Sequence, residues 1–332
     1  MKTESMFAVY ATKGDLQNPL VGLVVGERPF PEIPEGWVRV KVSHASLNRH
    51  DIFTLLGLTA QADPIVYPMI IGNDGAGTMD DGTEVAIYPV MGSDDWKGDE
   101  TLDPRWHIFS EIVQGTFADF VVMPKRNAVP RPAGLSAAEA AVMGTAWLTA
   151  YRMLFTKSNL KPGQTMLVQG ATGGMATALI QLGKAAGVEV WVTSRSNEGR
   201  EMAERLGADR TFGAGETLPK KVDAVMDNVG QATWSHSLES VRRGGTVLTV
   251  GITTGNDPSA NLLKIFVEQI TVAGTIMGTL DEFKSMMNFI VRAGIKPEIG
   301  EVIPHDGRRT CHSRHGRGQD TRQDRVHPVK RG

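Results

Sequence analysis

Three glycines stand where an apolar run gives way to a helical pattern, in 165-TMLVQGATGGMATALIQLGKAAG-187. Gly170, Gly173 and Gly174 have no side chains, so a pyrophosphate can come close to the backbone there. The N–H groups of a helix that begins at this turn can bind it. Ala176 occupies the last small position of the G-x-G-x-x-G pattern, so a tight structural turn is the alternative. The strand before the turn and the strand–helix units after it favour a dinucleotide site.

A second group of polar residues ends the next apolar strand, in 193-TSRSNEGR-200. An NAD-preferring site would place Asp or Glu about 20 residues after the glycine-rich turn, to bind the ribose hydroxyls. This chain has Ser194, Arg195 and Ser196 there instead. Hydroxyl donors and a positive charge suit a 2′-phosphate, so the segment favours NADPH over NADH, with a solvated surface arginine as the alternative.

The elements around these residues predict an α/β fold. Residues 1–130 have short apolar runs punctuated by Gly and Pro, typical of a β-rich domain. From residue 131 to residue 277, strands alternate with helical patterns, which predicts a doubly wound parallel sheet. Residues 278–304 return to the first domain and contain an amphipathic helix over 281–293. Four apolar residues lie on one face of that helix: Phe283, Met286, Met287 and Ile290. The helix ends before Gly294, which suits a C-terminal cap.

Composition excludes several classes of protein. The 332 residues are 41% hydrophobic and contain one cysteine, Cys311, which excludes an internal disulfide and a multi-cysteine zinc site. The sequence contains no run that could span a membrane and no secretory signal, so we expect a cytoplasmic protein. Residues 1–304 carry 27 basic and 34 acidic side chains, a net charge of −7, which argues against nucleic acid as a partner.

Several motifs together resemble the medium-chain dehydrogenase/reductase superfamily. They are 46-SLNRHD-51, 71-IGNDGAG-77, 162-PGQTMLVQGATGGMA-176, 206-LGAD-209, 227-DNVG-230 and 244-GGTVLTVG-251. The resemblance covers nearly everything from Met6 to Pro304. It implies a GroES-like β-rich catalytic domain joined to a Rossmann domain, with the active site in the cleft between them. It also implies cofactor contacts at Thr149, Gly170, Ala171, Thr172, Gly173, Gly174, Met175, Ser194, Arg195, Asn228, Gly251 and Ile252.

Zinc members of this superfamily bind their catalytic metal through two cysteines and a histidine that is followed by a glutamate. By resemblance those positions are Asn48, Asn73 with Asp74, and Thr145. None of them offers a thiolate or an imidazole, and the segment 91–115, where relatives have a structural zinc, has no cysteine. We therefore expect no metal.

Carbonyl polarisation without a metal must come from hydrogen-bond donors in the cleft. The resemblance places His50 where zinc members have the hydroxyl of their proton relay, and imidazole suits a proton donor. A loop-capping role for His50 is the equal alternative. Asn48 is a candidate for orienting the substrate oxygen, and Tyr67 is a weaker candidate because it can simply pack before Pro68. We expect Asp51 to fix its loop.

Two further polar groups have structural interpretations. The acidic side chains of Asp94, Asp95, Asp99 and Glu100 are expected to form a solvated loop rather than a cation site. His236, on a helical stretch, is expected to be structural.

Residues 305–332 form a tail of different composition. They contain no Leu, Ile, Phe, Met, Ala, Trp or Tyr, but have seven Arg, one Lys and four of the eight His. Such a stretch cannot build a core. Reading the codons of residues 315–330 from their second base permits MAEGKTRGKIVFTR and a stop, which resembles the ending of the family. We interpret the tail as a reading-frame shift that begins near His305, and expect residues beyond about 304 to be poorly ordered.

Together these features predict a zinc-independent, NADPH-dependent oxidoreductase that transfers hydride to a quinone or an α,β-unsaturated carbonyl. A zinc-free alcohol dehydrogenase or carbonyl reductase is one alternative, and a non-catalytic NADPH-binding protein is another. The expected partners are a small-molecule substrate and a second copy of the chain, since the resemblance implies a homodimer formed through 270-ITVAGTI-276.

Overall fold

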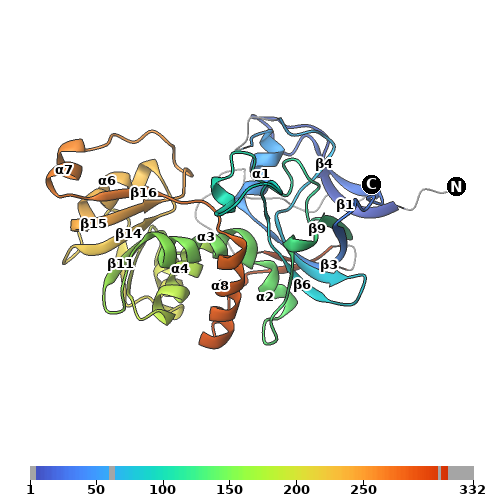
Figure 1. Ribbon diagram of the computed structural model, residues 1–332. Helices are drawn as coiled ribbons and strands as arrows, with labels where there is room; N and C mark the ends of the chain where they lie inside the picture. Colours follow the sequence, from blue (N-terminus) through green and yellow to red (C-terminus); the bar gives the residue numbers. More distant parts are fainter. Residues whose placement is uncertain (1–4, 60–63, 306–307, 313–332) are drawn as a thin grey trace.

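The chain forms two β-sheet lobes with helices lying between them (Figure 1). The computed structural model describes residues 5–59, 64–305 and 308–312. The lobe on the right of Figure 1 carries β1 to β10, and the lobe on the left carries the parallel sheet that begins at β11. Among the described residues, no helix is long and apolar enough to span a membrane.

The first lobe is built from short antiparallel strands around the long, bent strand β3. β3 pairs antiparallel with β5 on one side and with β9 on the other, and its residue Val40 is fully buried. Its strands are β1 (Ser5–Ala11), β2 (Leu23–Pro29), β3 (Trp37–Leu47), β4 (Met69–Ile70), β5 (Asp74–Met79), β6 (Glu84–Ile87), β7 (Val90–Met91), β8 (His107–Ile108), β9 (Phe120–Pro124) and β10 (Ala128–Pro130). The predicted β-rich domain is confirmed.

The second lobe is a sheet with the strand order β13-β12-β11-β14-β15-β16, in which all neighbours run parallel. This is the Rossmann order, and it confirms the predicted doubly wound sheet. Every residue of β11 is buried because helices cover both faces of the sheet. The strands are β11 (Thr165–Gln169), β12 (Glu189–Ser194), β13 (Arg210–Gly213), β14 (Val222–Asp227), β15 (Val241–Thr249) and β16 (Thr271–Gly274).

Helices connect these strands and fill the space between the lobes. α4 packs against β11 and β12, and α6 packs against β11, β14 and β15. The α-helices are α1 (Arg49–Leu56), α2 (Ala137–Ala141), α3 (Leu148–Tyr151), α4 (Gly174–Ala185), α5 (Asn197–Arg205), α6 (Gln231–Ser240), α7 (Leu262–Val267) and α8 (Leu280–Ala293). Two short 3₁₀ helices, η1 (Glu100–Leu102) and η2 (Lys125–Asn127), and two π-helical segments, η3 (Met143–Trp147) and η4 (Arg152–Lys157), complete the helical structure. α2 packs against β3, β5 and β6 of the first lobe, although it follows residue 130, where we placed the domain division.

The predicted amphipathic helix is α8, and its four apolar residues are all buried as expected. Gly294 caps its C-terminus with a φ of +67°, a left-handed conformation that glycine adopts without strain. At its N-terminus, Thr279 and Glu282 form a capping box. His236 on α6 is held by Gln169 and by the backbone carbonyl of Glu216, so the structural interpretation of this residue is confirmed.

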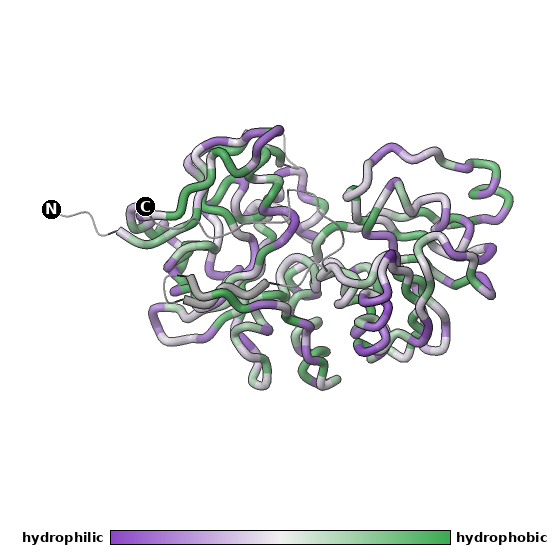
Figure 2. Tube along the Cα trace, turned by 180° about the vertical axis from the view of Figure 1, so that it is seen from behind, coloured by the Kyte–Doolittle hydropathy of each residue, from purple (hydrophilic) through white to green (hydrophobic). Residues whose placement is uncertain are grey.

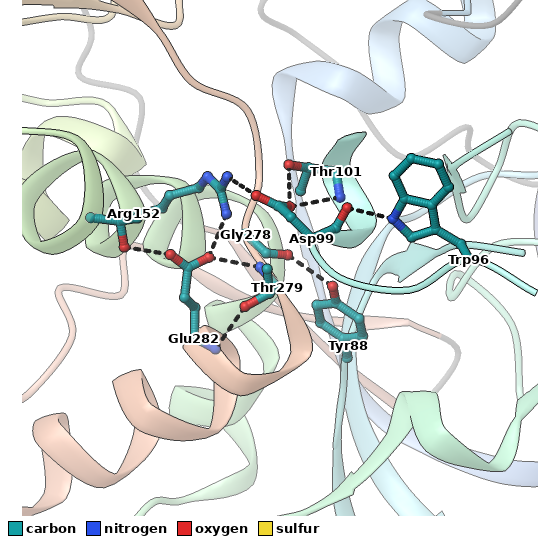
Figure 3. A network of polar contacts seen from close by, with 9 residues as sticks. Tyr88, Trp96, Asp99, Thr101, Arg152, Gly278, Thr279 and Glu282 are labelled. Atoms are coloured by element: carbon teal, nitrogen blue, oxygen red, sulfur yellow. Dashed lines mark hydrogen bonds and ion pairs between the residues drawn. The ribbon is translucent and has the colours of Figure 1, made fainter. Parts of the chain in front are cut away.

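A network of charged side chains fixes the place where the chain returns from the second lobe to the first (Figure 3). The buried guanidinium of Arg152 binds the carboxylate of Asp99 and lies 2.7 Å from Glu282 Oε2. Tyr88 donates a hydrogen bond of 2.8 Å to the carbonyl of Gly278. The expectation of a solvated acidic loop is therefore wrong for Asp99, because a cation 53 residues further along the chain binds its side chain.

The first residues of the tail have a regular backbone. β17 (Val302–His305) pairs antiparallel with β18 (Arg308–His312), and β18 pairs parallel with the end of β3. The strand pairing of residues 308–312 thus differs from the poor order expected beyond about residue 304. The rest of the predicted frame-shifted tail, residues 313–332, lies outside the described residues.

Candidate active site and cofactor cleft

The glycine-rich turn lies at the carboxyl end of β11, in the middle of the parallel sheet. Gly170 directly follows the strand and has a φ of +86°, which glycine tolerates and other residues rarely adopt. Gly173 is the N-cap of α4, and a Cβ placed on it would meet no atom within 4 Å. The space in front of the helix N-terminus is therefore open, as a pyrophosphate would need.

The loops after β14 and β15 meet beside this turn. A Cβ on Gly251 would lie 2.1 Å from the carbonyl oxygen of Asn228, so only glycine allows the two loops to touch. Asn228 Oδ1 is buried, has no hydrogen-bond partner among the described residues, and lies 3.9 Å from the Cβ position of Gly170. An unpaired buried acceptor beside an open turn fits a dinucleotide that brings its own donors.

Two arginines stand near the end of β12. Ser194 is buried at the end of the strand, whereas Arg195 is exposed, and Ser196 caps α5 by accepting from Gly199 N. Arg200, in the first turn of α5, donates to the carbonyl of Ser194 at 3.3 Å. The sequence interpretation did not include Arg200, although its place one helical turn after Ser196 could have indicated it.

Thr149 lies on α3, at the junction of the two lobes. Its side chain is buried and its hydroxyl donates to the carbonyl of Thr145 at 2.7 Å. The hydroxyl oxygen still has acceptor capacity, but its proton is committed to the helix.

The positions to which the family resemblance assigns zinc ligands lie around one buried carboxylate, Asp74. Its Oδ1 accepts from the hydroxyl of Thr145 at 2.6 Å, and its Oδ2 accepts from the amide of Asn48 at 2.9 Å and from Thr145 N at 3.1 Å. Ser46 adds a longer contact of 3.4 Å. Burial raises the pKa of Asp74 to about 6, although these hydrogen bonds oppose the rise.

Asn73 and Asp51 extend this network below Asp74. Asn73 Nδ2 donates to Ser110 Oγ at 2.8 Å and to the carbonyl of Phe109 at 3.1 Å, and lies 3.3 Å from Asp51 Oδ1. Asp51 Oδ2 accepts from Asn48 N at 2.6 Å, which is the loop-fixing role expected for it. Burial raises the pKa of Asp51 to about 7.

This donor set does not suit zinc. The cluster offers amides, hydroxyls and carboxylates, whereas tetrahedral zinc in proteins takes mainly thiolates and imidazoles. Within the described part of the chain, no group of three or more His, Cys, Asp or Glu side chains lies close enough to hold a metal ion.

His50 lies on the first turn of α1, at the rim of the network. Its Nε2 is 3.2 Å from Glu111 Oε1, and 19% of its side chain is exposed, whereas only 1% of the Glu111 side chain is exposed. Phe53 packs edge-on against the ring at 5.8 Å. Glu111 was not a sequence candidate, because no local pattern connects it with a residue 61 positions earlier.

The other two catalytic candidates have committed donors. Both amide hydrogens of Asn48 point toward acceptors of the protein, Asp74 Oδ2 and the carbonyl of Ser46. Asn48 could therefore orient a substrate only through its carbonyl oxygen. Tyr67 donates to the backbone carbonyl of Thr54 at 2.7 Å, which favours the packing role that its place before Pro68 allowed.

Two family models match the chain, one in each lobe. The model described as "Alcohol dehydrogenase GroES-like domain" matches residues 34–133, and the model described as "Zinc-binding dehydrogenase" matches residues 174–292. Their combination and order are those of a single two-domain family. The chain belongs to the medium-chain dehydrogenase/reductase superfamily. It is therefore an oxidoreductase, and its fold is one for which a nicotinamide cofactor is expected.

Relatives within this superfamily carry different names. A "zinc-type alcohol dehydrogenase-like protein" of Schizosaccharomyces pombe is 29% identical over 313 residues, which cover 83% of this chain and 87% of the relative. A "crotonyl-CoA carboxylase/reductase" of Cereibacter sphaeroides is 27% identical over 326 residues, covering 82% and 76%. A crystal structure of an NAD-dependent alcohol dehydrogenase superposes with a TM-score of 0.80 at 29% identity, covering 86% and 89%.

Proposed function

We propose that this medium-chain reductase works without zinc and uses NADPH to reduce a quinone or an α,β-unsaturated carbonyl. The observation that carries the proposal is the network around Asp74. Its carboxylate is occupied by Thr145 and Asn48, at the positions where zinc relatives have ligands. A metal would have to displace these hydrogen bonds and would gain neither a thiolate nor an imidazole.

The preference for NADPH rests on the charges at the end of β12. NAD-preferring sites have a carboxylate at the end of this strand. This chain has Ser194 and the exposed Arg195 at that position. Arg200 lies against the same strand end and supplies a second positive charge. Two guanidinium groups suit a 2′-phosphate, which each can bind through paired N–H donors.

Within the cleft, each group of the chain has one task. The open turn at Gly173 and the N-terminus of α4 bind the pyrophosphate, and Asn228 Oδ1 accepts a hydrogen bond from the bound nucleotide. The bound cofactor supplies the hydride. His50, at the edge of the buried network, gives the proton that balances the hydride.

The proposed class of acceptor rests on the donor set around Asp74, which does not suit a zinc ion that could polarise a carbonyl oxygen. A simple ketone or aldehyde needs strong polarisation of its oxygen before hydride attack, which metal ions supply in other enzymes. A quinone or an enone is already electron-poor at the carbon that takes the hydride. One relative, from Cereibacter sphaeroides, is named as a crotonyl-CoA carboxylase/reductase, which agrees with this class.

Turnover with purified protein tests the proposal. NADPH absorbance is followed with a metal chelator present, against one quinone, one enone and one aldehyde, and metal content is measured by mass spectrometry. We expect oxidation of NADPH with quinone or enone, little with aldehyde, and no loss of rate on chelation. Turnover of aldehyde alone would favour zinc-free carbonyl reduction, and NADPH binding without any turnover would favour a binding protein. Stoichiometric zinc that chelation removes together with activity would refute the zinc-free mechanism.

A second copy of the chain is the proposed protein partner. β16 lies at the edge of the parallel sheet, and the neighbouring helix α7 has no buried residue in the chain by itself. Hydrophobic residues lie along this edge (Figure 2), and those exposed by 40% or more are Leu262, Leu263, Phe266, Val267, Val272 and Ile276. Joining two such edges would cover both apolar surfaces.

A further inference from the structure

A buried hydrogen-bond network lies beside the glycine-rich turn, and no step of the proposed function uses it. Gln169 is the last residue of β11, directly before Gly170, and Thr193 is its neighbour in the parallel register with β12. Ser237 on α6 and Asp227 at the end of β14 complete the network in the second lobe (Figure 1). All four side chains belong to residues that are at most 2% exposed, so each needs its partners within the protein.

The hydrogen bonds of this network run in one direction, away from the turn. The backbone N–H of Gly170 donates to Thr193 Oγ1 at 3.3 Å, and the hydroxyl of Thr193 donates to Gln169 Oε1 at 2.7 Å. Gln169 Nε2 donates to Ser237 Oγ at 3.1 Å, and the hydroxyl of Ser237 donates to Asp227 Oδ2 at 2.6 Å. Each hydroxyl both accepts and donates, so its removal would leave the groups on both sides unpaired.

The network ends at the backbone that carries Asn228. Asp227 Oδ1 accepts from Val229 N and from Gly230 N, each at 3.0 Å, so the carboxylate fixes the backbone on the far side of Asn228. A Cβ on Gly170 would lie 3.7 Å from Val229 Cγ2 and 3.9 Å from Asn228 Oδ1, which places the turn against this loop. The turn and the loop are therefore joined twice, by direct contact and through the buried side chains.

A branch of the network fixes the orientation of the Gln169 amide. Its Nε2 also lies 2.9 Å from His236 Nδ1, and the other ring nitrogen of His236 lies 2.8 Å from the carbonyl oxygen of Glu216. Because α6 supplies both Ser237 and His236, the two amide hydrogens of Gln169 have acceptors on the same helix. Its Oε1 is thereby left for the hydroxyl of Thr193.

We propose that Gln169 and Thr193 are positioning residues for the cofactor, which hold the glycine-rich turn and the loop of Asn228 in their binding positions before NADPH arrives. The inference rests on the proposed function, in which these two segments bind the nucleotide. Thr193 also directly precedes Ser194 and Arg195, the residues proposed for the 2′-phosphate. A site that is already formed binds its ligand more tightly, because binding does not have to order the loops.

The test compares two buried threonines of the same strand pair. Thr193→Val keeps the shape of the side chain and removes the hydroxyl, so the Kd for NADPH should rise about tenfold. Thr193→Ser keeps the hydroxyl and should stay within about twofold of the wild type. Thr165→Val is the matched control, because Thr165 donates to Glu189 Oε2 at 2.7 Å at the opposite end of the β11–β12 ladder. It should bind NADPH as the wild type does.

Steady-state kinetics separate positioning from a general loss of activity. In Thr193→Val the KM for NADPH should rise about as much as the Kd, while kcat at saturating NADPH stays within about twofold, because the bound cofactor itself holds the loops in place. An equal fall of kcat in Thr193→Val and Thr165→Val, with unchanged KM, would contradict a role in cofactor binding.

Amide hydrogen exchange in the ligand-free protein tests the link between the two segments without NADPH. Thr193→Val and Ser237→Ala break the network at different places, and each should speed exchange about tenfold in both segments, 169–175 and 227–231. Thr165→Val should leave both segments at the wild-type rate. Faster exchange only in the segment next to each substitution, or equal NADPH affinity of Thr193→Val and Thr165→Val, would overturn the positioning role. If the wild type does not bind NADPH although exchange changes in both segments, the proposed function fails and only the link between the segments stands.

Discussion

Asp74 accepts hydrogen bonds at the positions to which the family resemblance assigns zinc ligands. The carboxylate takes both N–H and O–H donors from β3, from the segment after it and from η3. These donors come from segments that are distant in sequence, so the network joins the first lobe to the helical layer. Burial raises the pKa of this carboxyl group to about 6, although the hydrogen bonds from Thr145 and Asn48 oppose the rise.

The raised pKa of Asp51 predicts a dependence of stability on pH. Its value is about 7 in the folded protein and 3.8 when unperturbed, so the native state holds a proton that the unfolded state releases. The stabilisation is complete below about pH 4 and is lost as the pH rises to about 7, and each unit of pKa difference corresponds to about 1.4 kcal/mol. Denaturant unfolding between pH 4 and 8 should show this slope.

Asp51→Asn isolates that contribution. The variant has no proton to release at this position, so its free energy of unfolding should fall less steeply with pH than that of the wild type. Asp94→Asn, in an exposed loop, is the control and should keep the wild-type slope. Identical slopes for Asp51→Asn and the wild type would contradict the raised pKa.

Tyr67→Phe separates packing from catalysis. The hydroxyl of Tyr67 donates to the carbonyl of Thr54, which lies on the side of α1 that anchors the helix. Losing this hydrogen bond should cost about 1 kcal/mol of stability and leave kcat within about twofold. Steady-state kinetics and denaturant unfolding of the variant check both numbers. A large fall in kcat with unchanged stability would restore Tyr67 as a catalytic residue.

The sequence predicted the residues of local motifs, but it did not predict which distant side chains would form hydrogen bonds or ion pairs. Gly170, Gly173 and the charges after β12 follow from local patterns, because a strand, a turn and a helix are adjacent in the chain. Glu111 and Asp74 could not be assigned a partner in this way. Their contacts depend on the packing of segments that lie far apart in the sequence, and no periodicity records that packing.

At the scale of elements, the turn between β11 and α4 leaves open space at the position where we propose that the pyrophosphate binds. Gly173→Val would place a branched side chain into the open space before the helix N-terminus. The fold should tolerate it, because nothing lies within 4 Å of the new Cβ. NADPH affinity, measured by fluorescence titration, should fall at least tenfold, or about 1.4 kcal/mol.

The control for this turn is Gly26→Val in β2, where the nearest atom to a new Cβ is 3.8 Å away and the backbone is extended. NADPH should bind this variant as it binds the wild type. If Gly173→Val binds NADPH as tightly as the control does, the turn does not hold the pyrophosphate.

Arg152 connects three elements, and its removal should be costly. Arg152→Met leaves the carboxylates of Asp99 and Glu282 without their cation in a partly buried place. Breaking such a network typically costs about 3–5 kcal/mol. Arg152→Lys should recover only part of this, since one ammonium group cannot reproduce the planar contact with two carboxylates. Thermal unfolding measures all three proteins.

A surface pair provides the comparison. Arg242 binds Asp223 at 2.7 Å but is far more exposed than Arg152. Arg242→Met should cost no more than about 1 kcal/mol, because water screens exposed pairs. Equal losses for the two arginines would mean that the junction network in Figure 3 contributes no more than an ordinary surface contact.

The helices and strands were easier to predict than the contacts between them. The boundaries of α4 and α8 follow from helical periodicity and capping residues, which act within one turn of the chain. The pairing of Asp99 with Arg152 did not follow, because an acidic loop looks solvated until the fold brings a cation to it. β18 likewise pairs with β3 through backbone hydrogen bonds, which require no apolar side chain and leave no pattern in the sequence.

For the whole molecule, the exposed apolar edge of the second lobe predicts a dimer. Leu262 on α7 and Leu16 in the first lobe are each 69% exposed in the single chain, which makes them a matched pair. Sedimentation velocity should give the wild type twice the 35.9 kDa of one chain. Leu262→Glu should shift the protein toward the monomer, because a charge would be buried against the partner's apolar surface, whereas Leu16→Glu should remain a dimer. A wild type that sediments as a monomer at micromolar concentration would show that this edge faces water, and the exposed leucines would then need another partner.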